Sequence, residues 1–224
     1  MKKFLRENSL GLLFGLLFVA ALIVQAFVGH ADFNERQLSE GLAPVTLGRY
    51  VTSSSFAVDV TENWQSEYLQ FFLYIFLSAW LLQKGSPEST DLDKAGLESD
   101  RDQLVGPHAR ADSPAWAGTG GVRQLFFSHS LGVVMGALFL LSWLAQAITG
   151  VAAYNEQQIA NLQDPVSWSQ YLLRPDFWNR TLQNWQSEFL AVTSMVVLSI
   201  YLRQRGSSQS KPVGAPHAAT AVEG

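Results

Sequence analysis

The strongest constraint on the fold is a gapless internal repeat. When the chain is shifted by 121 residues, residues 9–86 align with residues 130–207, and 29 of the 78 aligned positions are identical. The identities include polar and turn residues, and the pentapeptide NWQSE occurs at 63–67 and again at 184–188. The chain is therefore expected to fold as two copies of one unit.

Each copy contains two apolar stretches. Residues 9–28 and 130–149 are long enough to span a bilayer core, which takes about 20 largely apolar residues. The runs 68–82 and 189–202 reach that length only if their helices begin upstream, near the two pentapeptides. Charged residues make up 15% of the chain, below the roughly 25% of a soluble domain. We predict an all-α integral membrane protein with four transmembrane helices, at about 9–29, 63–83, 129–150 and 184–204.

Two helices per copy would insert both copies the same way up, so the fold is expected to be two parallel tandem two-helix repeats, 1–86 and 123–207. Residues 87–122 are rich in Ser, Pro, Gly and acids, which predicts a flexible cytoplasmic linker, and 208–224 a disordered tail. In the outer loops, Thr46 and Ser167 are expected to cap short interfacial helices. A further helix is expected to begin near Ser55 or Asp176 and run into the next span.

Lysine and arginine residues predict the orientation of the helices. More of them flank the two termini and the linker than the outer loops, which carry only Arg36, Arg49, Arg174 and Arg180. Both termini are therefore expected in the cytoplasm. An alternative is a cleaved signal peptide ending near Gly29-His30-Ala31. The recurrence of the same segment at Ser130, in mid-chain, favours an uncleaved span.

Small residues repeat on the first helix of each copy. Gly11 and Gly15 form a GxxxG pattern, and Gly132 and Gly136 form its counterpart. Such pairs allow two membrane helices to approach closely. We expect the first and third helices to cross there, either within one chain or between chains.

Polar residues near the outer ends of the helices form the candidate site. At 1.5 Å per residue, Gln25 and Glu67 both lie roughly 6 Å below the outer membrane boundary. Gln25 can therefore hydrogen-bond Glu67, with Gln146 and Glu188 as the equivalent pair. The quartet acts either as structural glue or as an outward-facing polar pocket for a cation, a proton or a polar head group. Interface anchors are predicted at Trp64 and Trp185.

A second shared set lies just outside the first span of each copy. Asn34 and Glu35, with Asn155 and Glu156, are expected to cap the first helix and organise the loop, or alternatively to bind a ligand. Metal chemistry is not favoured, because no His follows a Glu at di-iron spacing and the chain has no cysteine. No catalytic motif, cofactor motif or basic nucleic-acid patch is present, so no catalytic residue, cofactor or nucleic-acid partner is predicted.

The shared motifs carry a resemblance. Each copy has S-L-G at the helix start, N-E after the span, P-V-[ST]-x-x-x-Y in the loop and N-W-Q-S-E-[YF]-L at the return. Over residues 2–86 and 123–207 the chain resembles an uncharacterised bacterial membrane-protein family, catalogued as a domain of unknown function. The resemblance implies a multi-pass protein of the bacterial inner membrane and brings no activity.

Two functions remain open from the sequence. The first is a non-enzymatic accessory, scaffold or binding subunit of a membrane assembly or homo-oligomer, whose partners are the lipid bilayer and a membrane protein or a second copy. The alternative is a small transporter or channel that uses Glu67 and Glu188. A transporter should carry polar residues through the membrane mid-plane, where the first and third helices offer mainly Phe, Leu and Ala. That composition favours the first function.

Overall fold

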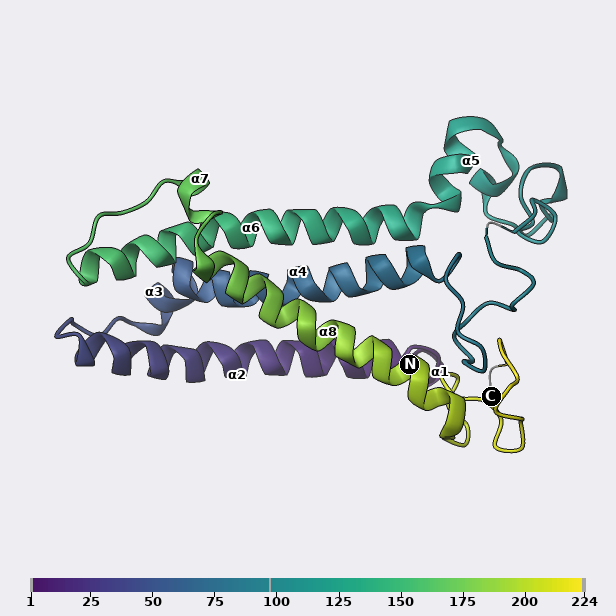
Figure 1. The fold of residues 1–224 in the computed structure, drawn as a ribbon, viewed down its shortest axis with the longest axis horizontal. Coiled ribbons are helices and arrows are strands. Elements are labelled where there is room, and N and C mark those ends of the chain that lie inside the picture. The colour runs from purple at the N-terminus through teal and green to yellow at the C-terminus, as the bar shows by residue number, and fades with distance from the viewer. Residues whose placement is uncertain (1, 97, 223–224) are drawn as a thin grey trace. The chain divides into compact units, whose positions relative to one another are not determined.

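The computed structural model describes residues 2–96 and 98–222. Within these residues the chain forms eight α-helices and two short 3-10 helices and no strand (Figure 1), which confirms the all-α prediction. The chain divides into two compact units, residues 1–61 with 145–177 and residues 62–144 with 178–224. The units do not coincide with the repeat copies, because each combines segments of both.

The first long helix of each copy is longer than expected. After α1 (Lys2–Glu7), α2 covers Ser9–Ser39, and α6 covers Ser130–Ala160. At 1.5 Å per residue, 31 residues extend about 46 Å. The predicted ends near 29 and 150 were set by hydropathy alone. The polar stretches that follow contain no proline, so nothing in the backbone ends the helix there.

A Schellman motif ends each of these helices. In α2 the Leu42 amide donates to the Gln37 carbonyl (2.8 Å), and Gly41 takes the left-handed conformation with φ 74°. In α6 the Gln163 amide donates to the Gln158 carbonyl (2.8 Å). The left-handed position there is occupied by Leu162 with φ 57°, which strains a residue with a side chain.

Short helices follow in both loops, as predicted. Helix α3 (Leu47–Val51) begins at Thr46, whose side chain accepts from the Arg49 amide. Helix α7 (Trp168–Tyr171) begins at Ser167, which forms a capping box with Gln170. Figure 1 shows α3 and the chain before it folded back beside the end of α2.

Both return helices begin and end at earlier residues than the predicted spans 63–83 and 184–204. Helix α4 covers Ser54–Leu77 and α8 covers Pro175–Tyr201, so each starts close to the predicted Ser55 or Asp176. Their ends fall short of the predicted 83 and 204. In the first copy, the polypeptide leaves the helix in a turn at residues 78–80.

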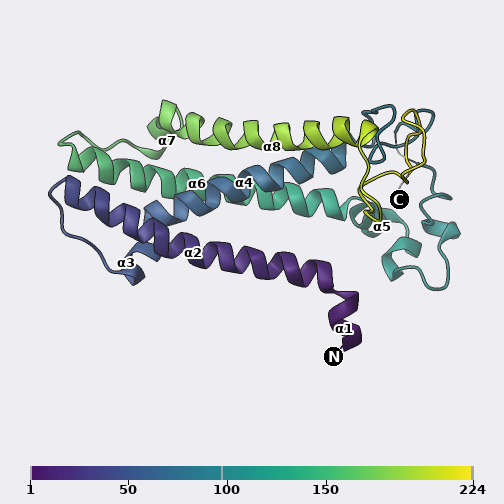
Figure 2. The same ribbon diagram turned by 90° about the horizontal axis from the view of Figure 1, so that it is seen from below.

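Turns and short helices make up most of the predicted linker, and the described part of the predicted tail, 208–222, consists of turns, bends and irregular chain (Figure 2). The linker contains η1 (Gly106–His108) and η2 (Ala115–Gly118) and leads into α5 (Gly121–Ser128). In the tail the buried Lys211 ammonium donates to the backbone carbonyl of Gly85 (2.6 Å) and to three tail carbonyls. Residue 97 of the linker and residues 223–224 of the tail lie outside the described residues. Flexibility of both segments stays a prediction.

Two of the described helices, α2 and α6, are long and apolar enough to cross a membrane, judged by length and composition. None of the 18 most apolar consecutive residues of α2 is buried by the rest of the chain. The sequence predicted four such helices, and α4 and α8 do not reach this criterion. The polar first half of each helix explains the difference, because fewer than 18 residues remain between the NWQSE motif and the end of α4 or α8.

Candidate functional site

The two NWQSE motifs meet side chain to side chain. Gln65 lies in α4 and is fully buried, and its Oε1 accepts a hydrogen bond from Trp185 Nε1 of α8 at 2.8 Å. One residue further on, the Ser66 hydroxyl donates to Glu188 Oε1 at 3.5 Å. Both bonds join residues from opposite copies of the repeat. We call these four residues the motif seam.

An ion pair extends the motif seam toward the start of α4. The Arg180 guanidinium donates to Glu62 Oε2 at 3.1 Å, again joining the two copies. The Glu62 side chain is 16% exposed and that of Arg180 is 36% exposed, so water reaches the arginine and screens the pair. The motif seam and this ion pair together place neutral and charged hydrogen bonds along one face of α4.

The buried face of the first motif differs from the predicted one. Gln65 and Ser66 are buried, as is Leu69 one turn later. Trp64 is 39% exposed and Glu67 is also exposed, so Glu67 does not point inward as expected. Helix periodicity accounts for this, because residues 64, 67 and 71 share one face while 65 and 69 lie on another. Gln65 was not among the predicted site residues, although its repetition as Gln186 was a signal.

Aromatic rings surround the second motif. The Trp185 ring lies 5.8 Å from Trp143 and 6.4 Å from Phe139, both on α6, and Trp143 also meets Trp178 edge-on at 6.3 Å. Trp185 was predicted to anchor at the membrane interface. Its indole N–H donates to Gln65 and its ring packs within this aromatic cluster, and its place at the interface stays a prediction. Trp143 has no aromatic counterpart in the first copy, where Leu22 stands.

The predicted polar quartet divides between the two compact units. Gln25 and Gln146 belong to one unit, and Glu67 and Glu188 belong to the other, so the expected Gln–Glu pairs stay predictions. The two glutamines also differ, since Gln25 is exposed and Gln146 is fully buried. Ser66 and Glu188 are joined in the motif seam, a pairing that the spacing argument did not anticipate.

Asparagine clips hold both loops. The Asn34 side chain accepts from the Val45 amide (2.8 Å) and donates to the Val45 carbonyl (3.0 Å). Asn155 makes the same two bonds to Val166, at 2.8 and 2.9 Å. Neither asparagine caps its helix, because both lie within it, and the cap of α2 is Glu40. Each clip instead fixes the loop to the helix across 11 residues.

The first clip has a third member. His30 Nε2 lies 2.7 Å from the Val45 carbonyl and 2.9 Å from Asn34 Nδ2. The second copy has Val151 at the equivalent position, so its clip relies on Asn155 alone. The two glutamates that were grouped with the asparagines, Glu35 and Glu156, are both exposed.

A tyrosine lies over a helix glycine in each copy. The Tyr50 and Tyr171 rings are buried, and their hydroxyls occupy the space where a side chain at Gly29 or Gly150 would begin. A Cβ at Gly150 would lie 2.6 Å from the Tyr171 hydroxyl oxygen. Burial, followed by the nearby Asp59 carboxylate, raises the pKa of Tyr50. All four residues are shared by the repeat, but the sequence alone did not link each tyrosine to its glycine.

The GxxxG glycines have unequal surroundings. No heavy atom of the described residues lies within 4 Å of a side chain built at Gly11, Gly15 or Gly132, whereas one built at Gly136 would meet the Phe72 ring at 3.1 Å. Gly136 is therefore used for packing inside the chain. Across the described residues, no group of three or more His, Cys, Asp or Glu side chains is placed to hold a metal ion.

A family model for a domain of unknown function, DUF6766, matches residues 1–222. The chain belongs to this family. The match covers both repeat copies together with the linker and most of the tail, and the family description assigns no activity. Neither the curated proteins nor the solved structures include a match.

Proposed function

We propose that this DUF6766 protein is a non-enzymatic, multi-pass protein of the bacterial inner membrane that serves as an accessory or scaffold subunit of a membrane assembly, or of its own oligomer. In this proposal α2, α4, α6 and α8 form a pseudo-symmetric four-helix bundle with cytoplasmic termini. The loops with α3 and α7 lie on the outer side.

The return helices suit this placement despite their charges. Polar groups inside a membrane need partners within the protein, because lipid offers none. The motif seam provides such partners between α4 and α8, since it joins Gln65 to Trp185 and Ser66 to Glu188. The pair Glu62 and Arg180 adds an opposite-charge contact near the outer ends of the same helices.

The open glycine face of α2 carries the proposal. A glycine inside a helix is less favourable than alanine by roughly 0.5–1 kcal/mol, and membrane helices use glycine pairs for close contact. Within the chain, Gly136 lies against the Phe72 ring. Gly11 and Gly15 meet no atom of the described residues, on a helix whose most apolar window is not buried. A second membrane helix outside the chain would use this face.

The test is native mass spectrometry of the tagged protein, extracted gently from its own membrane. We expect a defined larger assembly or a homo-oligomer, which dissociates in a variant carrying Gly11→Leu and Gly15→Leu. The control carries Leu13→Phe and Leu17→Phe, which add bulk with the same spacing on the opposite face of α2. A wild-type monomer in native lipid would overturn the proposal.

The rival function is a small transporter or channel that uses Glu67 and Glu188. The half-buried Glu188, bonded to Ser66 in the motif seam, is the observation that favours it. The test compares ion flux in liposomes for the wild type and for a variant carrying Glu67→Gln and Glu188→Gln. Loss of flux with an intact fold would replace the accessory role with transport. No flux in the wild type would remove the rival.

A further inference from the structure

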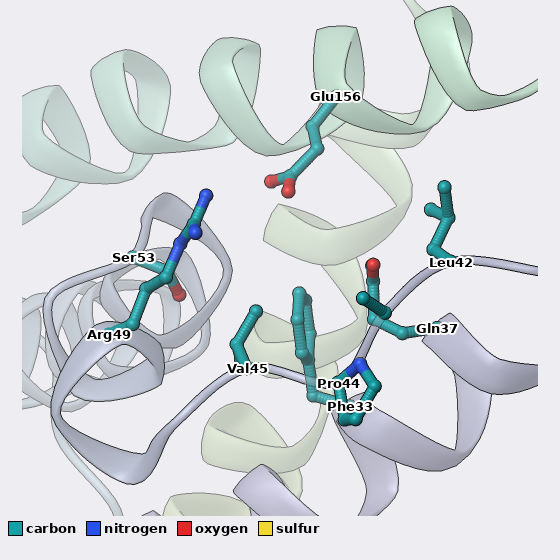
Figure 3. A pocket seen from close by; sticks show the side chains of 9 residues that line it. Phe33, Gln37, Leu42, Pro44, Val45, Arg49, Ser53 and Glu156 are labelled. Carbon is teal, nitrogen blue, oxygen red and sulfur yellow. The ribbon is translucent and has the colours of Figure 1, made fainter.

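A pocket of about 290 Å³ lies beside the first outer loop. Phe33, Pro44 and Val45 give it an apolar floor, and Arg49 and Glu156 line its sides (Figure 3). The glutamate comes from α6, and the other four residues come from α2, α3 and the loop between them. All of them belong to one compact unit.

The floor of the pocket is held by contacts already described. Val45 is fixed at both backbone groups by the Asn34 clip. Phe33 is buried, with its ring 5.4 Å from that of Tyr50. The pocket is therefore built before any ligand binds, which lowers the entropic cost of binding.

The two charged residues point into the same space without neutralising each other. Figure 3 shows the Arg49 guanidinium and the Glu156 carboxylate directed toward the pocket from opposite elements. Among the described residues, neither side chain makes a hydrogen bond or an ion pair. A positive and a negative group thus face one small, apolar-floored space, and each has unused hydrogen-bonding capacity.

The second copy lacks this combination. Gln170 stands where the first copy has Arg49, and its side-chain oxygen is occupied by the Ser167 cap. Glu35 stands where the second copy has Glu156, is exposed, and does not line the pocket. The charge pair is therefore specific to the first loop and is not a by-product of the repeat.

We infer that this pocket binds a small zwitterion, with an anionic phosphate or carboxylate on Arg49 and a primary amine on Glu156. A guanidinium pairs with the two oxygens of such an anion in a fork, and a carboxylate accepts hydrogen bonds from an ammonium. The short carbon link between the two groups lies on the apolar floor. The volume is at the lower end for ligand pockets, which suits a head group or an amino acid.

Two sources share this chemistry, the ethanolamine phosphate head group of a phospholipid and a free zwitterion such as an amino acid. The lipid source rests on the proposed function, which places the loop with α3 beside the outer membrane surface. The free source requires only that the loop is open to solvent. If the pocket does not bind the lipid or the free zwitterion, the test of assembly through Gly11 and Gly15 is unaffected.

The experiment uses the full chain in nanodiscs of phosphatidylethanolamine, phosphatidylcholine or phosphatidylglycerol, with retained lipid measured by native mass spectrometry. Isothermal titration with phosphoethanolamine and with glycine tests the free source. The variants are Arg49→Gln, which copies the residue of the second repeat, and Glu156→Gln. The matched control is Glu35→Gln, at the position equivalent to Glu156.

We expect selective retention of phosphatidylethanolamine, because the methylated amine of phosphatidylcholine cannot donate to Glu156 and phosphatidylglycerol has no amine. Either variant should weaken binding about tenfold, and the control should not. Binding of the soluble probes alone, with the same dependence on Arg49 and Glu156, would assign the site to a free zwitterion. Absence of binding to every probe, or binding unchanged in both variants, would overturn the inference. Both substituted side chains are exposed, and thermal unfolding checks that the variants fold.

Discussion

The two outer loops have the same backbone design and different side chains. Both use an asparagine clip, a Schellman ending and a tyrosine over a glycine. They differ in the left-handed residue, where Gly41 corresponds to Leu162, and in charge, where Arg49 corresponds to Gln170. The comparison teaches that one hydrogen-bonded frame can support different side chains, so that a charge pair stands on one copy alone.

The largest expected effect concerns the glycine faces of α2 and α6. Gly136→Leu forces its side chain into the Phe72 ring, so it should lower the free energy of unfolding by about 3 kcal/mol, the upper range for overpacking. Gly15→Leu meets no atom of the described residues and replaces a poor helix former, so it should raise that free energy by up to about 1 kcal/mol while weakening association. Thermal unfolding of the solubilised monomer measures the change in stability for each variant. Equal destabilisation would contradict the difference between the copies.

The two motif glutamines provide the next comparison. Gln65→Ala removes a buried partner of the Trp185 indole and should cost about 2 kcal/mol. Gln186→Ala changes an exposed residue and should stay within about 0.5 kcal/mol. Chemical unfolding in mild detergent, followed by tryptophan fluorescence, separates them. If the exposed glutamine had the larger effect, the assignment of the buried face would be wrong.

The clips should differ by a smaller amount. Asn155→Ala leaves both backbone groups of Val166 without their side-chain partner and should cost about 1.5 kcal/mol. Asn34→Ala should cost less, because His30 still reaches the Val45 carbonyl. A double variant with His30→Val, the residue found in the second copy, should remove that advantage. Hydrogen exchange at the Val45 and Val166 amides reports each loop separately.

The smallest expected effect is an increase in stability. Leu162→Gly relieves a left-handed residue whose side chain is 97% exposed, so it should raise the stability of the protein by about 1 kcal/mol. Gly41→Leu should lower it by a similar amount. Thermal unfolding of the pair against the wild type is the measurement. A loss in Leu162→Gly would show that the strain is compensated elsewhere.

The positions of the helices could be predicted from the sequence better than the side-chain contacts between them. The caps at Thr46 and Ser167 and the early starts of α4 and α8 followed from local backbone chemistry, which a sequence carries directly. The ends of α2 and α6 did not, because hydropathy marks where an apolar run stops and not where a helix stops. The Gln65–Trp185 bond joins residues 120 positions apart, and no local rule encodes it.

The tail bonds of Lys211 have a topological consequence. Its ammonium donates to the Gly85 carbonyl, and the Ala221 amide donates to the Ser86 carbonyl, so the end of the chain returns to the end of the first copy. Repeat proteins are prone to exchange copies between chains by domain swapping. Here the chain from 85 to 211 is closed by noncovalent bonds into a ring that contains the whole second copy. A swapped dimer would have to open that ring first, so the tail favours each chain keeping its own second copy.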